Sequence, residues 1–372
     1  MNLFCSPLGL HYLCRRKTTK CEMNYNTILK NKYLVPVAIC FVCICTAVYV
    51  FFFSSLIRQD DTYYLYIDND DTCDSIFAKL EPNAKLFPMM GLKNLARHTS
   101  YENHIKTGRY AIKSGEGSLI VYRHLKNGLQ SPVRLTIPSV RTIDRLAGEM
   151  SRKLMPDSTE FIEKLTDMDT CAKYGYDTAT IVCMFIPETY EVYWNMSVDG
   201  FMDRMKKESD RFWNDSRKEK AERLQLSPEE VITLASIVDE ETANNDEKPM
   251  IAGMYYNRLM LKNESNPKGM PLQADPTVKF ALKQFELKRI YHNMLNTDSP
   301  YNTYKYAGLP PGPIRIPTVA GIDAVLNLVH HDYLYMCAKE DFSGKHNFAS
   351  TYQEHLANAS KYSKALNERG IN

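Results

Sequence analysis

The hydrophobic pattern of the chain changes sharply between Lys32 and Arg58. The 25 residues from Tyr33 to Ile57 carry no charge, and Val, Ile, Phe, Cys and Ala dominate them. A bilayer core of about 30 Å needs roughly 20 apolar helical residues, and a helix pairs every backbone amide internally. The apolar region of a cleaved signal peptide is normally only about 7–15 residues long and ends at small residues, whereas this run continues through Phe51-Phe52-Phe53. The pattern therefore predicts an uncleaved transmembrane helix over residues 33–57.

Short predicted strands and helices, in which polar and apolar residues are mixed, follow the apolar run. Apolar and polar positions alternate over residues 62–72, which indicates a strand. The next segments predict helices at 74–80 and 86–101, a strand at 108–112, a turn at 115–117 and a helix at 119–125. Together they form a small β-α-α-β unit, which we place at residues 62–130.

A second region begins after the segment Gly128–Pro132. A strand at 133–137 and an amphipathic helix at 142–154 look like the start of a similar unit, which indicates a weak internal repeat. Residues 197–224 are charged and helical in pattern. The overall expectation is an α+β protein whose largest domain covers residues 131–372.

The helix predicted over residues 226–243 is the most informative element. Ser227-Pro228-Glu229-Glu230 supplies an N-cap serine, a proline at the first helical position and a glutamate at the third, which is a capping box. Val231, Leu234, Ala235 and Val238 then mark one apolar stripe. At about 100° per residue Glu240 points away from this stripe and Glu241 lies on its margin. A carboxyl group there can be half buried, where the neutral acid is favoured.

Composition and charge exclude several classes of protein. Hydrophobic residues make up 44% and charged residues 24% of the 372 residues, a balance that excludes a disordered or collagen-like chain and indicates two to three folded units. The net charge is only +2, whereas proteins that hold nucleic acid by bulk electrostatics have a larger basic excess. Residues 1–57 carry six basic residues and one acid. The positive-inside rule thus predicts residues 1–32 as a cytoplasmic tail and residues 58–372 on the other side of the membrane.

Cysteines and histidines do not predict a metal site. Six of the ten cysteines lie in the tail or the apolar run. The wide spacing of the other four matches no zinc or CxxC pattern; they are Cys73, Cys171, Cys183 and Cys337. One or two disulfides among them are compatible with the sequence, and single buried thiols are the favoured interpretation.

The acidic triplet Asp239-Glu240-Glu241 is the candidate for chemistry. Taken alone it is more typical of a solvated helix end, although the C-terminal end of a helix prefers cations. Downstream segments are dense in amides, hydroxyls, tyrosines and rigid Pro/Gly turns, which suits recognition of a sugar. Gln273 and Asp275 have a structural alternative, since they could cap Thr277.

Several segments resemble, in order, the signature blocks of the MltG/YceG-like endolytic murein transglycosylases. The blocks are residues 185–190, 234–242, 257–259, 272–278, 301–304 and 308–314, and a closing block with His346, Phe348 and His355. Two positions depart from the family pattern. Glu188 stands where the family usually has Asp, and Ile137-Pro138-Ser139-Val140 stands where many members carry Pro-Glu-Gly. Neither departure lies in the acidic helix.

The resemblance implies a reaction and a set of roles. Lytic transglycosylases cleave the β-1,4 bond between N-acetylmuramic acid and N-acetylglucosamine and leave a 1,6-anhydro end, so one carboxyl group suffices where ordinary glycosidases use two. Glu241 matches the position of the catalytic acid, with Asp239 as the runner-up. Substrate binding or orientation of the acid falls to Gln273, Asp275, Asn302 and Tyr304. No cofactor and no metal are expected, and the unit at 62–130 resembles a LysM module.

The same resemblance implies location and partners. We expect a single-pass protein of the inner membrane with a periplasmic catalytic part, peptidoglycan strands as substrate and peptidoglycan synthases as partners, and no nucleic acid. The sequence leaves open the synthase, the oligomeric state, endo- against exo-cleavage, and whether translation starts at Met1 or Met23.

Two other functions remain open at this point. A degenerate relative would bind glycan and act as a scaffold of the synthesis machinery without cleaving it. A hydrolase would need a second carboxylate across the cleft, for which Asp275 is the candidate. A protease is disfavoured because no GxSxG elbow or metal set is present.

Overall fold

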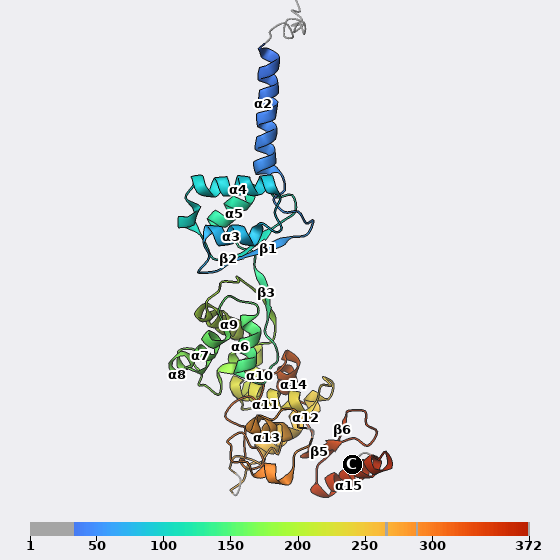
Figure 1. Ribbon diagram of the computed structural model, residues 1–372. Helices are drawn as coiled ribbons and strands as arrows, with labels where there is room; N and C mark the ends of the chain where they lie inside the picture. The colour runs from blue at the N-terminus through green and yellow to red at the C-terminus, as the bar shows by residue number, and fades with distance from the viewer. Residues whose placement is uncertain (1–32, 265–266, 288, 371–372) are drawn as a thin grey trace, which may run out of the picture. The chain divides into compact units, whose positions relative to one another are not determined.

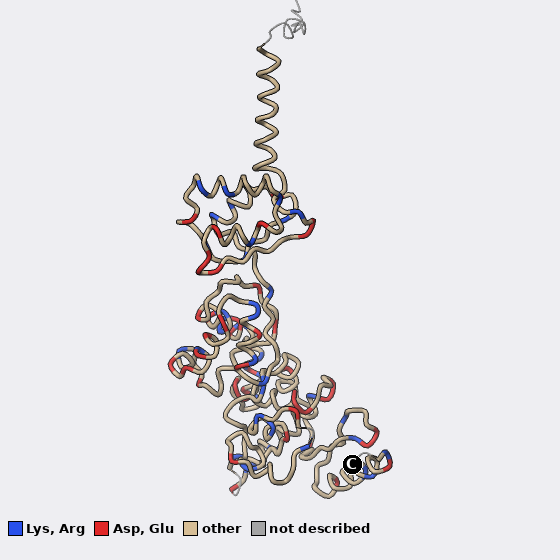
Figure 2. The backbone as a smooth tube through the Cα atoms, in the orientation of Figure 1, with Lys and Arg blue, Asp and Glu red and all other residues tan. Residues whose placement is uncertain are grey.

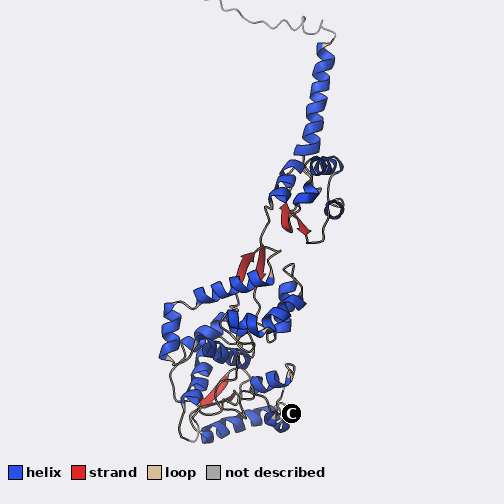
Figure 3. Cartoon of the chain, turned by 90° about the vertical axis from the view of Figure 1, so that its left-hand side faces the viewer, coloured by secondary structure: helices blue, strands red, loops and turns tan. Residues whose placement is uncertain are grey.

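The structure is a computed structural model that describes residues 33–264, 267–287 and 289–370. The predicted cytoplasmic tail 1–32 and the choice between Met1 and Met23 lie outside the described residues. The chain has a mixed α/β fold, rich in helices, with three separate two-stranded sheets among the described residues (Figures 1 and 3). It divides into two compact units. The first contains the residues up to Tyr63 with Phe77–Asn103 and Ile112–Arg123, and the second contains Tyr64–Ile76, His104–Ala111 and the residues from His124 onward.

The apolar run forms a helix that ends earlier than the sequence predicts. The α-helix α2 (Leu34–Val48) continues into one π-helical turn, η1 (Tyr49–Phe53). These 20 residues form the one helix among the described residues that is long and apolar enough to cross a membrane, and the tube in Figure 2 carries no charge along it. The predicted limit at Ile57 is wrong. Leu56 and Ile57 are buried in the first unit, where Ile57 bridges to Ala84, and an uncharged buried segment cannot be told from a membrane segment by composition.

Close backbone contacts join the end of this helix to its own unit. A Cβ atom on Gly91 would lie 2.1 Å from the carbonyl oxygen of Phe51, and one on Gly117 would lie 2.5 Å from that of Phe52. The hydroxyl group of Ser118 donates to the carbonyl oxygen of Phe51 at 3.1 Å. The last turn of the helix is therefore packed against α4 (Leu86–His98) and the start of α5 (Ser118–Asn127).

The predicted β-α-α-β order is present in the chain. It consists of β1 (Tyr63–Ile67), α3 (Cys73–Leu80), α4 and β2 (Gly108–Ile112), with a 3-10 turn η2 (Tyr101–His104) before β2. The two strands are hydrogen-bonded neighbours. The turn at 115–117 precedes α5, which ends at Asn127 as the Asn-Gly pair predicts.

A similar order recurs at the start of the larger part of the second unit. Strand β3 (Val133–Thr136) pairs antiparallel with β4 (Thr189–Val192) in the register Val133↔Val192. Between and after them lie α6 (Ile143–Ser151), α7 (Ser158–Thr166), α8 (Met168–Lys173), η3 (Ile181–Met184) and α9 (Val198–Phe212). Phe161, Phe185 and Phe201 form the centre of one hydrophobic core, with ring centroids 5.4 and 5.8 Å apart.

A second hydrophobic core lies in the same unit and carries the acidic helix. Its helices are α10 (Asp215–Arg223), α11 (Pro228–Glu241), α12 (Lys248–Met260), α13 (Asp275–Leu282) and α14 (Val319–Leu326), with a 3-10 turn η4 (His292–Asn296). The chain closes with the antiparallel pair β5 (Tyr335–Ala338) and β6 (His346–Ala349) and with α15 (Tyr352–Glu368). Cys171 and Cys183 are buried free thiols, as the favoured interpretation of the cysteines predicts.

Candidate active site

Helix α11 lies at the centre of the second core. The hydroxyl oxygen of Ser227 accepts from the backbone N–H of Glu230 at 3.2 Å, and the Glu230 carboxylate accepts from the N–H of Ser227 at 2.8 Å. The predicted capping box is thereby confirmed. The prediction of a single apolar stripe is wrong, because every residue from Val231 to Asp239 is buried. The buried hydroxyl group of Ser236 is fully hydrogen-bonded. It donates to the carbonyl oxygen of Thr233 and accepts from the backbone N–H of Ile314 at 3.0 Å.

The first acid at the helix end, Asp239, is neutralised inside the protein. Its carboxylate lies 2.7 Å from the ammonium group of Lys248, and both side chains are almost completely buried. It also accepts from the backbone N–H of Thr318 at 2.6 Å. Asp239 therefore fastens α11 to α12 and to the start of α14, and it does not line the pocket described below. The runner-up for the acid is thus a structural group.

The second acid, Glu240, is held by two arginines. Arg141 donates to it through Nε and Nη2, both at 2.8 Å. Arg315 donates through Nη1 at 3.0 Å. These cations offset the unfavourable interaction between a carboxylate and the negative end of the helix dipole. Glu240 does not line the pocket described below, which Glu241 lines.

The third acid, Glu241, has a phenol in place of a cation. The hydroxyl group of Tyr255 donates to its Oε1 at 2.6 Å. Burial raises the pKa of the Glu241 carboxyl from 4.5 to about 7. The negative charge of Asp275 adds to this rise, while the hydrogen bond from Tyr255 and the charges of His346 and Lys279 oppose it. Glu241 can therefore hold a proton near neutral pH.

Glu241 lines a pocket of about 280 Å³. Of the residues predicted from the sequence, Gln273, Asp275 and Tyr304 line the same pocket and Asn302 does not. The other lining residues are Met254, Tyr255, Arg258, Leu272, Met336, Cys337, Ala338 and His346. The pocket is thus built from the end of α11, one side of α12, the loop before α13 and the strands β5 and β6.

The loop before α13 is fixed by Arg258, which the sequence analysis did not single out as a site residue. Its guanidinium group donates to the carbonyl oxygen of Leu272 at 2.7 Å and to Oε1 of Gln273 at 3.3 Å. Gln273 adopts the left-handed conformation, with φ at 52°, a strained backbone state for a residue other than glycine. Strain of this kind occurs where the surrounding contacts over-determine the backbone, and here it brings the Gln273 side chain to the pocket.

Asp275 and Tyr304 form a second polar pair in the pocket. The hydroxyl group of Tyr304 donates to Oδ1 of Asp275 at 2.6 Å. Burial, followed by this hydrogen bond, raises the pKa of the Tyr304 phenol far above its usual range. Tyr304 therefore stays a hydrogen-bond donor at every physiological pH. The alternative in which Asp275 caps Thr277 does not occur, because the Thr277 hydroxyl bonds to Ala274 and Thr303.

Asn302 has no contact with the pocket. Its side chain is completely buried, and its amide group donates to the backbone carbonyls of Leu295 and Thr297, both at 2.8 Å. Its Oδ1 accepts from the N–H of Tyr304 at 3.0 Å. The role expected for Asn302 in contacting a substrate is therefore corrected to a role in holding the loop that carries Tyr304.

His346 and Tyr255 belong to the site although the sequence analysis assigned them no role. Nδ1 of His346 lies 3.0 Å from Oε2 of the buried Glu247, whose other oxygen accepts from the His346 backbone N–H at 2.7 Å. Its place in the closing motif block was the only signal for His346, whereas Tyr255 lies two residues before the block 257–259. Within the described residues no three His, Cys, Asp or Glu side chains are grouped so as to hold a metal ion.

Two further cavities are lined in part by residues of α13. The smaller has a volume of about 40 Å³ and the larger about 270 Å³, and Arg141 and Phe280 line both. At the larger cavity the rings of Phe280 and Tyr301 lie 4.8 Å apart. Asp275 lines the pocket of Glu241 and Phe280 lines both of these cavities, so residues of α13 contribute to all three.

Comparison with known proteins gives matches over most of the chain. The profile of the YceG-like family matches residues 65–361. A protein of Bacillus subtilis (strain 168) named endolytic murein transglycosylase is 37% identical over 152 residues, which are 41% of this chain and 39% of that protein. A protein of the same name from Streptococcus pneumoniae (strain ATCC BAA-255 / R6) is 27% identical over 308 residues, which cover 71% of this chain and 52% of that protein. The chain thus matches about half or less of the length of these curated relatives.

A solved structure shows the same fold. The crystal structure of a YceG-like protein from Listeria monocytogenes matches with a TM-score of 0.53 and 24% sequence identity, over 80% of this chain and 99% of that one. At this identity the match supports the fold alone. The sequence relatives and the geometry around Glu241 carry the argument on function.

Proposed function

The chain belongs to the YceG-like family, and from this premise we propose that it is a membrane-anchored endolytic transglycosylase of peptidoglycan with Glu241 as its acid and base. The observation that carries the proposal is the environment of Glu241. It is the one acid of the triplet without a cationic partner, it lines a pocket, and burial raises its pKa to about 7. A carboxyl group with such a pKa can donate a proton and take it back near neutral pH.

In the proposed reaction Glu241 acts twice. It first donates its proton to the glycosidic oxygen, and the bond between that oxygen and the anomeric carbon of N-acetylmuramic acid breaks. The 6-hydroxyl oxygen of the same sugar then forms a bond to the anomeric carbon, and its proton passes to Glu241. The product is a 1,6-anhydro end, no water is consumed, and the acid is regenerated.

The neighbours of Glu241 determine which oxygen carries the proton. Tyr255 donates to Oε1, and burial together with the Glu241 charge keeps the pKa of its phenol high, so that oxygen is occupied by an incoming hydrogen bond. The mobile proton is therefore held on Oε2. We assign Gln273, Asp275 and Tyr304 to binding the substrate or orienting the acid, and Asn302 to holding Tyr304 through its backbone.

The three cavities to which α13 contributes support binding of a strand that extends beyond the cleaved bond. The larger cavity offers the paired rings of Phe280 and Tyr301, and aromatic faces pack well against the apolar faces of sugars. A groove with several sugar positions favours attack within a strand, which is the endolytic mode.

The remaining parts of the proposal concern the anchor and its surroundings. Helix α2 with η1 would span the inner membrane, with residues 1–32 in the cytoplasm and the catalytic part, 131–372, on the periplasmic side. The β-α-α-β segment within 62–130 would act as a LysM-like glycan-binding module. Peptidoglycan synthases are the proposed partners, contacted through the membrane.

The test uses the full chain in detergent, incubated with intact peptidoglycan sacculi. Mass spectrometry of the released fragments should show anhydro-muramic ends with the wild type. The variant Glu241→Gln should produce them about 10²- to 10⁴-fold more slowly, the usual contribution of a general acid and base. The matched control Glu222→Gln removes an exposed acid of α10 and should leave the rate unchanged.

Two results would redirect the proposal. Products with ordinary reducing ends would identify a hydrolase and require a second carboxylate, for which Asp275 is the candidate. Glycan that binds but is not cut by the membrane-reconstituted wild type would identify a scaffold.

A further inference from the structure

Helix α4 exposes large apolar side chains beside the end of the membrane-spanning candidate. Leu86, Phe87 and Met90 are 67%, 52% and 49% exposed, although they lie within two turns of one short helix. The other side of α4 is buried in the first unit through Pro88, Met89, Gly91, Leu92 and Ala96. Such a cluster on an otherwise packed helix marks a surface that binds a membrane or a partner.

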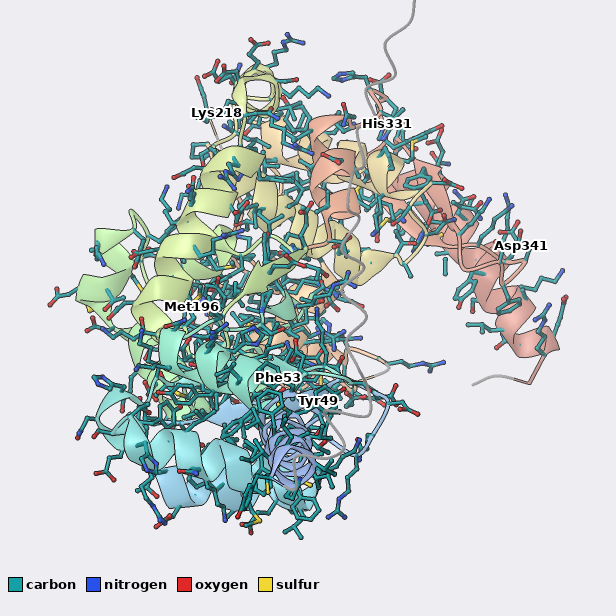
Figure 4. All side chains as sticks on the ribbon, turned by 90° about the horizontal axis from the view of Figure 1, so that it is seen from above. Tyr49, Phe53, Met196, Lys218, His331 and Asp341 are labelled. Atoms are coloured by element: carbon teal, nitrogen blue, oxygen red, sulfur yellow. The ribbon has the colours of Figure 1, made fainter. Side chains whose placement is uncertain are left out.

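The geometry of the first unit connects this cluster to α2. Gly91 allows α4 to touch the carbonyl group of Phe51, and the rings of Phe51 and Phe87 have centroids 5.6 Å apart. In Figure 1 α4 runs crosswise to α2 directly at its lower end, with α5 on its far side. Figure 4 looks down α2, where the labelled Tyr49 and Phe53 mark the last turn of the helix next to α4. The exposed apolar surface of α2 and η1 therefore continues onto α4.

We propose that α4 lies in the interface of the lipid bilayer, with Leu86, Phe87 and Met90 inserted at the boundary of headgroups and acyl chains. Because α2 would enter the bilayer and α4 is held crosswise at the end of α2 and η1, α4 lies at the level where the membrane span stops. The second half of the exposed face is polar, with Asn94 and the basic Arg97, and Lys93 beside them pairs with Glu81. This combination is typical of interfacial helices that bind anionic lipids. The inference rests on the membrane anchoring proposed above.

Insertion of α4 would give the anchor a second function. A single spanning helix can tilt and rotate, and interfacial side chains restrict both motions. Because the last helical turn is fixed to α4 by backbone contacts, the interfacial helix would hold the whole first unit in one orientation on the membrane.

The experiment places an indole probe on the proposed surface. The full chain with Phe87→Trp is reconstituted into vesicles of phosphatidylcholine and phosphatidylglycerol, with or without brominated acyl chains that quench tryptophan on contact. The unsubstituted chain, with its two native tryptophans, gives the baseline. The matched control is Tyr352→Trp, an aromatic side chain of the second unit with 60% exposure. Met90→Trp serves as a second probe if the ring contact with Phe51 does not tolerate an indole.

The proposal predicts that the added fluorescence of Trp at position 87 or 90 is quenched at least twofold more strongly than that of the control. Equal quenching at all positions, or none at 87 and 90 in chains that float with the vesicles, overturns the interfacial helix and leaves the anchor in place. A chain that does not float with vesicles overturns the anchor and the inference together.

Discussion

Two helices of this chain end in functional regions, and they end in opposite ways. The helix α2–η1 ends among apolar side chains and close backbone contacts, without a charge. Helix α11 ends in three consecutive carboxyl groups, of which Asp239 is buried and the other two are half-buried. The first arrangement fixes the orientation of the helix end against α4, because Gly91 and the backbone carbonyl group of Phe51 are in close contact. The second arrangement determines whether Glu241 holds a proton.

The difference lies in how each end satisfies its polar groups. At η1 the carbonyl group of Phe51 receives the hydroxyl group of Ser118, and no ionisable group is involved. At α11 a buried lysine neutralises Asp239 and two arginines neutralise Glu240. Only Glu241 keeps an uncompensated charge when it ionises. A site of this kind costs stability, and the variant Glu241→Gln below measures that cost.

The largest effect on stability is expected from breaking the buried pair of Asp239 and Lys248. Asp239→Ala leaves an ammonium group buried without its counter-ion, which typically costs about 3–5 kcal/mol. Thermal unfolding in detergent should show a large loss for this variant and almost none for Asp246→Ala, an exposed acid. The double variant Asp239→Leu with Lys248→Met should recover most of the loss. If Asp239→Ala unfolds at the same temperature as Asp246→Ala, the pair of Asp239 and Lys248 does not hold α11 in place.

A smaller and opposite effect is expected from Glu241→Gln. The folded pKa of about 7 lies above the ordinary 4.5, so the stabilising contribution of the neutral acid is complete below pH 4.5 and is lost as the pH rises through 7. Glutamine keeps the neutral shape at every pH. The variant should therefore match the wild type near pH 4 and exceed it by up to about 3 kcal/mol above pH 8. A constant difference across this range would mean that the pKa is not raised.

The sequence predicted the acidic helix end well and its partners poorly. The capping box at Ser227 and the place of Glu241 follow from local spacing, which acts over four residues. Lys248 lies only nine residues from Asp239, but Arg141 and Arg315 are 99 and 75 residues from Glu240. No pattern in the sequence links groups that far apart. For that reason the roles of three similar acids could be distinguished only in the folded chain.

The same limit explains the errors at Ile57 and Asn302. Leu56 and Ile57 extend an uncharged run, and nothing in their composition shows that they pack inside the first unit. Asn302 sits in a segment rich in polar groups, and its amide group bonds to backbone carbonyls instead of facing the pocket. Hydropathy and polarity report residue type, whereas burial depends on the neighbours that the fold supplies.

The close contact between α4 and the end of η1 can be tested by adding a methyl group at Gly91. Gly91→Ala places a Cβ atom where the carbonyl oxygen of Phe51 would lie at 2.1 Å, and overpacking of this kind costs about 1–3 kcal/mol. The matched control is Gly148→Ala in the interior of α6, where a Cβ atom meets nothing within 4 Å. That change should stabilise by about 0.5–1 kcal/mol. Equal thermal stability of the two variants would mean that α4 does not press on the helix end.

The smallest predicted effects are two opposite shifts in the pH dependence of cleavage. The hydrogen bond from Tyr255 lowers the pKa of Glu241, and the charge of Asp275 raises it. Tyr255→Phe should therefore move the alkaline limb of the rate profile, where Glu241 loses its proton, to higher pH. Asp275→Asn should move the same limb to lower pH.

These two shifts separate an electrostatic role from a structural one. Loss of fold or of substrate affinity lowers the rate at every pH and leaves the midpoint of the limb in place. Opposite displacements of the limb require that Tyr255 and Asp275 both act on the pKa of the same titrating carboxyl group. Glu241 is that group, because the phenol of Tyr255 lowers its pKa and the carboxylate of Asp275 raises it. If both limbs stay at the wild-type midpoint, the group that titrates in catalysis is not Glu241, and the pocket histidine His346 becomes the residue to test.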